Sequence, residues 1–311
     1  MVIGIAVCSI LYMAGAIWVG FDDIEEVGAN FPWWILVPVT GLTLLNYGLR
    51  FLKWRYFLHR LQVPMPLGED AWNFTAGLSM ALSPGKAGEL LKPYVVRERT
   101  GVPMATTIPA LISEKLTDGI AVLILAGASV SVAAQDQTLL LAIFCAVTII
   151  GLLVLAHEGL SLWCVRFLGT LPGLRNVSSK LEEMLFALRK CVAPLPLFLT
   201  VLVSIVAWGA ECIGFQMVLH GLNVDASLEA CVFIYAFATL AGIFVPFLAD
   251  FGLVGVSLVL ISGLTQSVAL GGAFIIRLCT FWIGVALGAI ALFKVSSMLG
   301  GIDLDSGGNE E

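Results

Sequence analysis

Charged residues interrupt two of the longest apolar stretches in this sequence. Glu114, Lys115 and Asp118 stand together in one stretch, and Arg277 stands about ten residues from either end of another. Glu114 and Asp118 are four residues apart, so on a helix they share one face and could neutralise Arg277 across an interior. The cations Lys115 and Arg277, with Lys86, are candidates to bind a phosphate group.

Three further carboxylates stand in or beside apolar stretches. Glu211 lies midway along one of them, Asp250 lies at a break between two others, and Glu89 follows a Pro-Gly break. A carboxylate is favoured at a helix N-terminus, so Glu89 could cap a half-helix. We expect Glu89, Glu211 and Asp250, like Glu114 and Asp118, to balance charge or to act as coupling groups, and Glu211 and Asp250 could each instead be a proton or counter-ion group or a cap.

The composition shows which solvent surrounds these charges. The chain has 311 residues, of which 59% are hydrophobic and 12% charged, whereas soluble domains carry about 25% charged residues. Hydrocarbon cannot satisfy backbone N–H and C=O groups, so only helices or a closed barrel span a membrane. The apolar stretches are long and continuous rather than alternating. The sequence therefore predicts an all-α polytopic membrane protein.

Interior charges of this kind are costly and usually mark a pathway or a partner. A charge at the centre of a bilayer costs about 2.5–3.5 kcal/mol or more. Three interpretations remain open for them: a cationic site for a lipid phosphate, purely structural ion pairs between helices, and long side chains that reach the membrane surface.

The sequence contains no recognisable metal, cofactor or nucleic-acid site. The seven cysteines are scattered without a C-x-x-C pair, and the three histidines show no ligand spacing. The net charge is −6, and no basic patch for nucleic acid occurs. No nucleophile, base and metal set stands out, so we expect a non-enzymatic protein without cofactors.

Basic stretches predict the topology, because loops rich in lysine and arginine stay in the cytoplasm. They place both termini inside, with about six crossings and two re-entrant hairpins, or about eight hydrophobic helices. The stretch 2–20 has no basic n-region, so it is expected to be a first transmembrane helix rather than a cleaved signal. The six crossings are expected at 2–20, 33–49, 103–132, 138–156, 195–219 and 266–293.

Two segments are too broken or too short to cross simply. Residues 70–94 and 228–263 carry proline and glycine between apolar arms, and the first has basic residues on both flanks. Such backbone is tolerated in a membrane only where protein or a wet cavity surrounds it. We expect one hairpin entered from the cytoplasm and one, with a longer first arm, entered from outside.

The two halves of the chain form a predicted inverted repeat in a single membrane domain. Repeat one covers about 33–132 and repeat two about 195–294. Inverted repeats with broken helices are typical of secondary transporters, because two similar halves of opposite orientation give two states of similar energy. An offset of 162 positions aligns helix breakers and cations: Pro84 with Pro246, Gly101 with Gly263, and Lys115 with Arg277.

The segment 157–192 is polar, basic and predicted to be cytoplasmic. Within it, residues 178–192 show helical spacing of apolar side chains. This amphipathic helix could lie on the inner membrane surface or pack on the cytoplasmic end of the bundle. The acidic tail 300–311 is expected to be disordered.

Several motifs resemble those of a known family. The run 82–90, Leu-Ser-Pro-Gly-Lys-Ala-Gly-Glu-Leu, and the later run 113–118, Ser-Glu-Lys-Leu-Thr-Asp, resemble the signature of flippase-like membrane proteins. That family is related to the transmembrane half of lysylphosphatidylglycerol synthases. The resemblance covers most of the chain. Further positions that match the family pattern are Asn46, Arg50, Trp208, Glu211 and Arg277.

One departure from the family pattern concerns the second half. The family usually has a Pro-Gly-Gly-x-Gly-x-x-Glu stretch there, whereas this chain has Pro-Phe-Leu-Ala-Asp-Phe-Gly at 246–252. The glutamate is absent, and Asp250 is the carboxylate that stands in its region.

The resemblance implies translocation of a phospholipid or a polyprenyl-phosphate-linked lipid across the plasma membrane of a prokaryote. The soluble aminoacyl-transferase half of the synthases is missing here, so lipid aminoacylation is not expected. Membrane lipids are the expected partners. The alternatives are a membrane-embedded lipid-modifying enzyme, and a non-catalytic partner or regulator that binds a lipid- or cell-envelope-modifying enzyme through the helix at 178–192.

Overall fold

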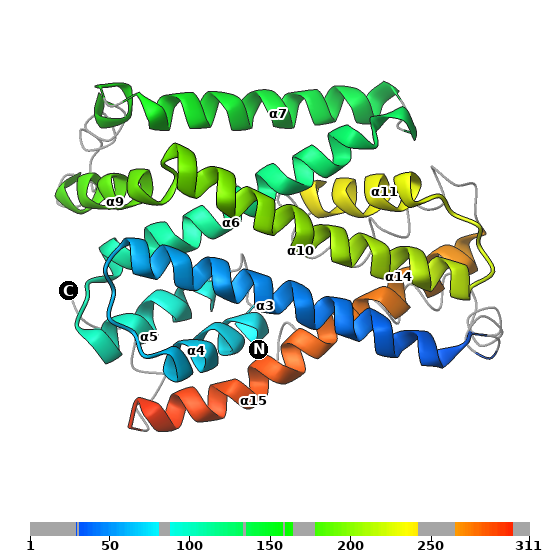
Figure 1. The fold of residues 1–311 in the computed structure, drawn as a ribbon, viewed down its shortest axis with the longest axis horizontal. Coiled ribbons are helices and arrows are strands. Elements are labelled where there is room, and N and C mark those ends of the chain that lie inside the picture. The colour runs from blue at the N-terminus through cyan, green and yellow to red at the C-terminus, as the bar shows by residue number, and fades with distance from the viewer. Residues whose placement is uncertain are drawn as a thin grey trace.

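The computed structural model describes residue 29 and residues 31–80, 88–132, 135–157, 159–163, 178–241 and 265–300. Within these ranges the chain is helical and contains no β-strand (Figure 1). The elements in chain order are η1 (Trp33–Ile35), α3 (Leu36–Arg60), α4 (Leu67–Ser79), α5 (Leu91–Thr100), α6 (Met104–Ala128), η4 (Val130–Val132), α7 (Gln135–Ala156), α9 (Ser178–Cys191), α10 (Pro194–Gly221), α11 (Leu228–Ala241), α14 (Gln266–Arg277), the π-helical η7 (Leu278–Trp282) and α15 (Ile283–Met298).

Within the described residues, three stretches of helix are long and apolar enough to cross a membrane: Trp33–Arg60, Pro194–Gly221 and Gly271–Met298. The helix α6 has 25 residues but carries three charged ones. Shorter apolar helices lie at Leu141–Ala156 and Leu228–Leu240. The protein is therefore an α-helical membrane protein, while the total of six crossings and the side on which each terminus lies stay predictions.

Local sequence explains where the helices near the charged residues end. Gly101 ends α5 in the left-handed region, with φ of 73°, and its N–H donates to the carbonyl of Arg97 at 2.8 Å. A glycine pays no Cβ penalty in that conformation. Pro103 follows and stands just before α6 begins at Met104, so the chain turns sharply between the two helices.

The two short helices α4 and α11 begin at opposite ends of the molecule. The helix α4 follows α3 at the end of the bundle that carries α9, and α11 follows α10 at the other end (Figure 1). They have 13 and 14 residues, which is roughly 20 Å at 1.5 Å per residue. That length is less than the bilayer core of about 30 Å.

Helices from the two halves of the chain pack against each other in a matched way. The helices α3 and α10 pack together, α4 packs on α15, and α11 packs on α6. The offset of 162 residues carries α4 onto 229–241, beside α11, and carries the start of α6 onto the start of α14. The inverted repeat stays a prediction. It requires the short helix of each half to pack on the long helix of the other half, and α4 on α15 and α11 on α6 are packed in this way.

One predicted boundary is wrong. The second crossing was expected at 33–49, which would leave Arg50 and Lys53 in the loop that follows it, but α3 continues to Arg60. The charges did not stop the helix because Lys53 turns inward and is buried. The charge of Lys53 therefore belongs to the interior of the helix bundle and does not indicate a loop.

The amphipathic helix α9 packs against α6 and α3. Leu185, Ala187 and Cys191 are buried, while Phe186 is 51% exposed. This packing favours the second interpretation, a helix on the end of the bundle. The first predicted crossing, the hairpin breaks that hold Lys86 and Asp250, and residues 301–311 lie outside the described residues.

Candidate functional site

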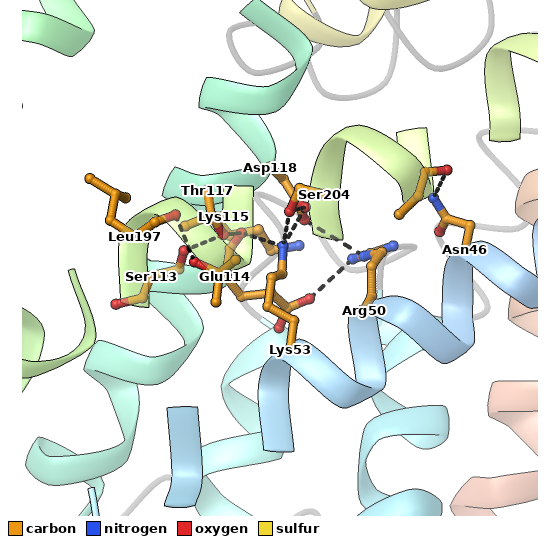
Figure 2. Close-up of polar contacts among 12 residues, drawn as sticks. Asn46, Arg50, Lys53, Ser113, Glu114, Lys115, Thr117, Asp118, Leu197 and Ser204 are labelled. Atoms are coloured by element: carbon orange, nitrogen blue, oxygen red, sulfur yellow. Dashed lines mark hydrogen bonds and ion pairs between the residues drawn. The ribbon is translucent and has the colours of Figure 1, made fainter. Parts of the chain in front are cut away.

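Five ionisable side chains form a buried cluster between α3, α5 and α6. Lys53 forms an ion pair with Asp118, Lys92 lies 2.5 Å from Glu114, and Arg50 lies 3.3 Å from Glu114. Arg50 also lies 3.6 Å from Asp118. Figure 2 shows Arg50 and Lys53 pointing from α3 toward the two carboxylates of α6. We call these five residues the inner cluster.

Helical spacing on α3 and α6 positions the inner cluster. Arg50 and Lys53 are one turn apart on α3, and Glu114 and Asp118 are one turn apart on α6, so each pair presents one face to the other. Lys92 comes from α5, and its Nζ lies 4.4 Å from the centroid of the Trp54 ring. That contact is a cation–π interaction, which stabilises an ammonium group away from water.

The helix α10 closes the cluster on a further side. Lys53 donates to Ser204 Oγ at 2.7 Å, and Ser204 Oγ donates to Asp118 at 2.9 Å. Two turns before Lys53 on α3, Asn46 Nδ2 donates at 2.9 Å to the carbonyl of Ala207, which lies one turn after Ser204 on α10 (Figure 2). These bonds fix α3 against α10 at the depth of the cluster.

Burial differs among the members in a way that matters for binding. The side chains of Lys53 and Glu114 are fully buried, whereas that of Arg50 is 17% exposed. Arg50 Nε is buried and makes no hydrogen bond within the described residues. Arg50 is therefore the cation of the inner cluster that an incoming group reaches first.

The charges of the inner cluster do not cancel. Three cations face two carboxylates, so the cluster carries an excess of one positive charge when the described residues alone are counted. An uncompensated buried charge is expensive. An anion that bound beside Arg50 would balance it, and a phosphate oxygen matches the guanidinium geometry.

The cluster lies deep in the helices that carry it. Glu114 is ten residues from the start of α6, and Arg50 is ten residues from the end of α3. Both separations correspond to about 15 Å at 1.5 Å per residue. The cluster thus lies about half a bilayer core from the end of the bundle that carries α9.

Lys115 stands apart from this cluster. Its side chain is 43% exposed, and its Nζ lies 2.7 Å from a carboxylate oxygen of Glu89. Two of the predicted site residues are thus brought together as a neutral pair. Glu114 and Asp118 pair with Arg50, Lys53 and Lys92 rather than with Arg277.

A second group of polar side chains lies where α10, α11 and α14 meet, and we call it the outer cluster. Glu211 accepts a hydrogen bond from Tyr235 Oη at 3.1 Å, and the guanidinium of Arg277 lies 5.8 Å from the centroid of the Tyr235 ring. All three residues are buried. Glu211 is ten residues from the end of α10, about 15 Å from the opposite end of the bundle.

The helix that carries Arg277 changes its winding immediately after it. Residues Leu278–Trp282 form a π-helical turn, and such turns occur frequently at functional sites. Tyr47 Oη donates to the carbonyl of Thr280 inside this turn. Tyr47 stands one turn before Arg50 on α3, so it links the winding change to the helix of the inner cluster.

Sequence reasoning missed Lys53, Lys92 and Ser204 as members of the site. Both Lys53 and Lys92 stand at the edge of an apolar stretch, where a cation usually lies on the surface. The spacing of Asn46, Arg50 and Lys53, at i, i+4 and i+7, was the available signal, since it places all three on one helix face. Lys92 and Ser204 had no comparable signal. Among the described residues, no group of His, Cys, Asp or Glu is arranged to hold a metal ion.

Apolar helices and two buried groups of charges define an integral membrane protein whose interior is polar in two places. The family described as the lysylphosphatidylglycerol synthase transmembrane region matches residues 1–288, and the chain belongs to this family. It is 25% identical over 305 residues to a UPF0104 membrane protein of the archaeon Methanothermobacter thermautotrophicus, an alignment that covers 92% of this chain and 90% of the relative. No solved structure matches the chain.

Proposed function

We propose that this protein is a flippase or transporter that moves a phospholipid or a polyprenyl-phosphate-linked lipid across the cytoplasmic membrane. The observation that carries the proposal is the excess positive charge of the buried inner cluster, in a protein of a family named for a lipid synthase. A lipid phosphate supplies the missing negative charge, and its acyl or prenyl chains can stay in the membrane.

The arrangement of the helices supports transport rather than simple anchoring. Two short helices begin at opposite ends and each packs on a long helix of the other half of the chain. Secondary transporters use this arrangement to open alternately to the two sides. The inner and outer clusters lie about 15 Å from opposite ends, so a headgroup would meet one cationic group on each side.

The structure changes which residues we assign to headgroup binding. Arg50 becomes the first residue to contact the headgroup, because it is the most exposed cation of the inner cluster and shares both of its carboxylate partners with the two lysines. Arg277 keeps its proposed role in the outer cluster. Lys115, which is exposed and pairs with Glu89, would meet the headgroup before Arg50 does, and Lys86 keeps its proposed role in phosphate binding.

Liposomes test the proposal directly. The purified chain is reconstituted with fluorescent phospholipids or a fluorescent polyprenyl-phosphate sugar, and a membrane-impermeant reductant reports how fast the lipid crosses. We expect faster crossing than in empty liposomes and at least a tenfold loss in Arg50→Gln, since a charge-assisted hydrogen bond is worth about 1.5–3 kcal/mol. Arg99→Gln is the matched control, because Arg99 is exposed and binds Glu69.

Absence of crossing with every tested lipid, from folded protein and under an imposed gradient or potential, would contradict the proposal. Equal rates for Arg50→Gln and the wild type would refute the assignment of the inner cluster.

A second candidate function is that of a non-catalytic partner of a lipid- or cell-envelope-modifying enzyme. Phe186 favours it, since this aromatic side chain is 51% exposed on α9 while its neighbour Leu185 is buried. Phe186→Glu would then abolish co-purification with the enzyme and leave lipid crossing intact. Leu185→Glu cannot serve as this test, because it would also disturb the packing of α9 on α6.

A further inference from the structure

Lys92 reaches the inner cluster through an enclosed place between three other helices. Its Nζ lies 4.4 Å from the centroid of the Trp54 ring on α3 and 5.1 Å from that of the Phe74 ring on α4. Its side chain is 5% exposed, and its Nζ lies 2.5 Å from a carboxylate oxygen of Glu114 on α6. A cation enclosed in this way contacts the carboxylate of Glu114 and is shielded from an incoming headgroup.

Gly77 on α4 leaves the room that the aliphatic part of Lys92 needs. A Cβ added at Gly77 would lie 3.0 Å from Cγ and 3.0 Å from Cδ of Lys92. These atoms stand in the middle of the side chain, so a shift of either one also moves the ammonium group. One turn earlier on α4, Asn73 Nδ2 donates to the carbonyl of Lys92 at 3.2 Å. The same face of α4 therefore contacts both the side chain and the backbone of Lys92.

The opposite face of α4 is fixed against α15. Thr75 and Ser79 lie on that face, since side chains two residues apart point about 200° apart around a helix. A Cβ at Gly288 of α15 would lie 2.9 Å from the carbonyl oxygen of Thr75, so the two helices are in close contact. Because α15 holds it there, α4 cannot withdraw from Lys92 to admit a side chain in place of Gly77.

The distances around Glu114 show what Lys92 contributes to the site. The carboxylate of Glu114 lies 2.5 Å from Lys92 and 3.3 Å from Arg50, so the lysine is the nearer partner. A carboxylate that Lys92 already holds competes less for the guanidinium of Arg50. Without Lys92, Arg50 would be the nearest cation to this carboxylate among the described residues, and less of its guanidinium would be free to meet an anion.

We infer that Lys92 is a positioning residue of the headgroup site and that Gly77 sets its position. Lys92 holds the carboxylate of Glu114, and Arg50 thereby stays available for the lipid phosphate. This inference rests on the proposed function and names two further residues that determine how tightly the site binds an anionic headgroup. The competing explanation is that Lys92 contacts the headgroup directly.

Binding of a fluorescent phosphatidylglycerol to the purified full chain in detergent micelles, followed by fluorescence anisotropy, tests the inference without transport. A fluorescent polyprenyl-phosphate sugar takes its place if the wild type does not bind the phospholipid. We expect Gly77→Ala to weaken binding several-fold, although every charge is retained. Gly68→Ala is the matched control on the same helix, because a Cβ there meets nothing within 4 Å. Equal affinities of folded Gly77→Ala and the wild type would overturn the role of Gly77.

A rescue experiment separates positioning from direct contact. Lys92→Met should weaken binding of the probe about tenfold, since Arg50 then makes its charge-assisted hydrogen bond to Glu114 instead of to the probe. Adding Glu114→Gln releases Arg50, so the double variant should regain the affinity of the wild type. The double variant is expected to fold, because removing both members of a buried ion pair is often tolerated. A double variant that binds as weakly as Lys92→Met would overturn the positioning role.

Reversible unfolding in mixed detergent micelles supplies a measurement that needs no lipid. Gly77→Ala should lower the free energy of unfolding in the wild type and leave it almost unchanged in Lys92→Ala, because that variant lacks the atoms that the new methyl group would meet. Equal losses in the two backgrounds would overturn the contact between Gly77 and Lys92.

Binding and crossing together distinguish this inference from the proposed function. A wild type that binds a probe but moves no lipid across liposomes would remove the proposed function and leave the binding series to decide on Lys92. Normal crossing with unchanged binding in Gly77→Ala and Lys92→Met would overturn the inference and leave the proposed function standing. A wild type that binds neither probe would overturn the inference together with the anion site.

Discussion

Replacing single members of the inner cluster should have unequal effects on stability, because the cluster already has one cation too many. Asp118→Asn raises the excess from one positive charge to two and leaves Lys53, which is fully buried, without its carboxylate. Removing one partner of a buried ion pair costs about 3–5 kcal/mol. Lys53→Met instead brings the excess to zero.

The smaller cost of Lys53→Met can be worked out from the contacts that remain. Asp118 keeps Arg50 at 3.6 Å and Ser204 at 2.9 Å. The variant therefore loses the charge-assisted hydrogen bonding of one ammonium group, which is worth about 1.5–3 kcal/mol. Methionine has a similar shape and adapts well to the vacated space.

Reversible unfolding in mixed micelles of mild detergent and increasing SDS, followed by circular dichroism, measures both free energies. We expect Asp118→Asn to lose clearly more than Lys53→Met. The double variant Lys53→Met/Asp118→Leu removes both buried ions and should be more stable than Asp118→Asn alone. Equal losses for the two single variants, or a larger loss for Lys53→Met, would refute the charge count on which the anion site depends.

Three further outcomes follow from contacts away from the inner cluster. Gly288→Val should abolish stable folding or lower the melting temperature strongly, because even a Cβ at that position would lie 2.8 Å from Ser79 Cβ, where α4 and α15 touch. Size-exclusion chromatography and thermal unfolding measure the effect. A normal elution profile and melting temperature would mean that the two helices can separate to admit the side chain. Tyr47→Phe should cost about 1 kcal/mol, measured by the same SDS unfolding, since it deletes the hydrogen bond into the π-helical turn; no loss would show that this carbonyl finds another donor. The hydrogen bond from Arg99 lowers the pKa of the exposed Glu69 carboxyl. This pair therefore adds to the free energy of unfolding at pH values above the ordinary pKa of a glutamate, and the contribution is lost as acid protonates Glu69. Glu69→Gln should slightly flatten the acid side of a plot of unfolding free energy against pH, and a large change would contradict the exposure of the pair.

The sequence by itself determined the helical membrane class, because no soluble fold can cover so much apolar surface with so few charges. It also located the motifs around Glu114 and Asp118, since a charge in an apolar helix is expensive wherever the helix packs. Gly101 and Pro103 break helices through their own backbone geometry, whatever packs around them, and the structure has helix ends at both positions.

Only the tertiary structure decided which charges meet. Lys53 and Lys92 have the sequence context of surface cations, and only the packing of α3, α5 and α6 turns them inward toward the carboxylates. Lys115, adjacent to Glu114, turns the other way and pairs with Glu89. Neighbours in sequence point about 100° apart on a helix, so ion-pair partners depend on helix rotation and contact, which hydropathy and spacing do not determine.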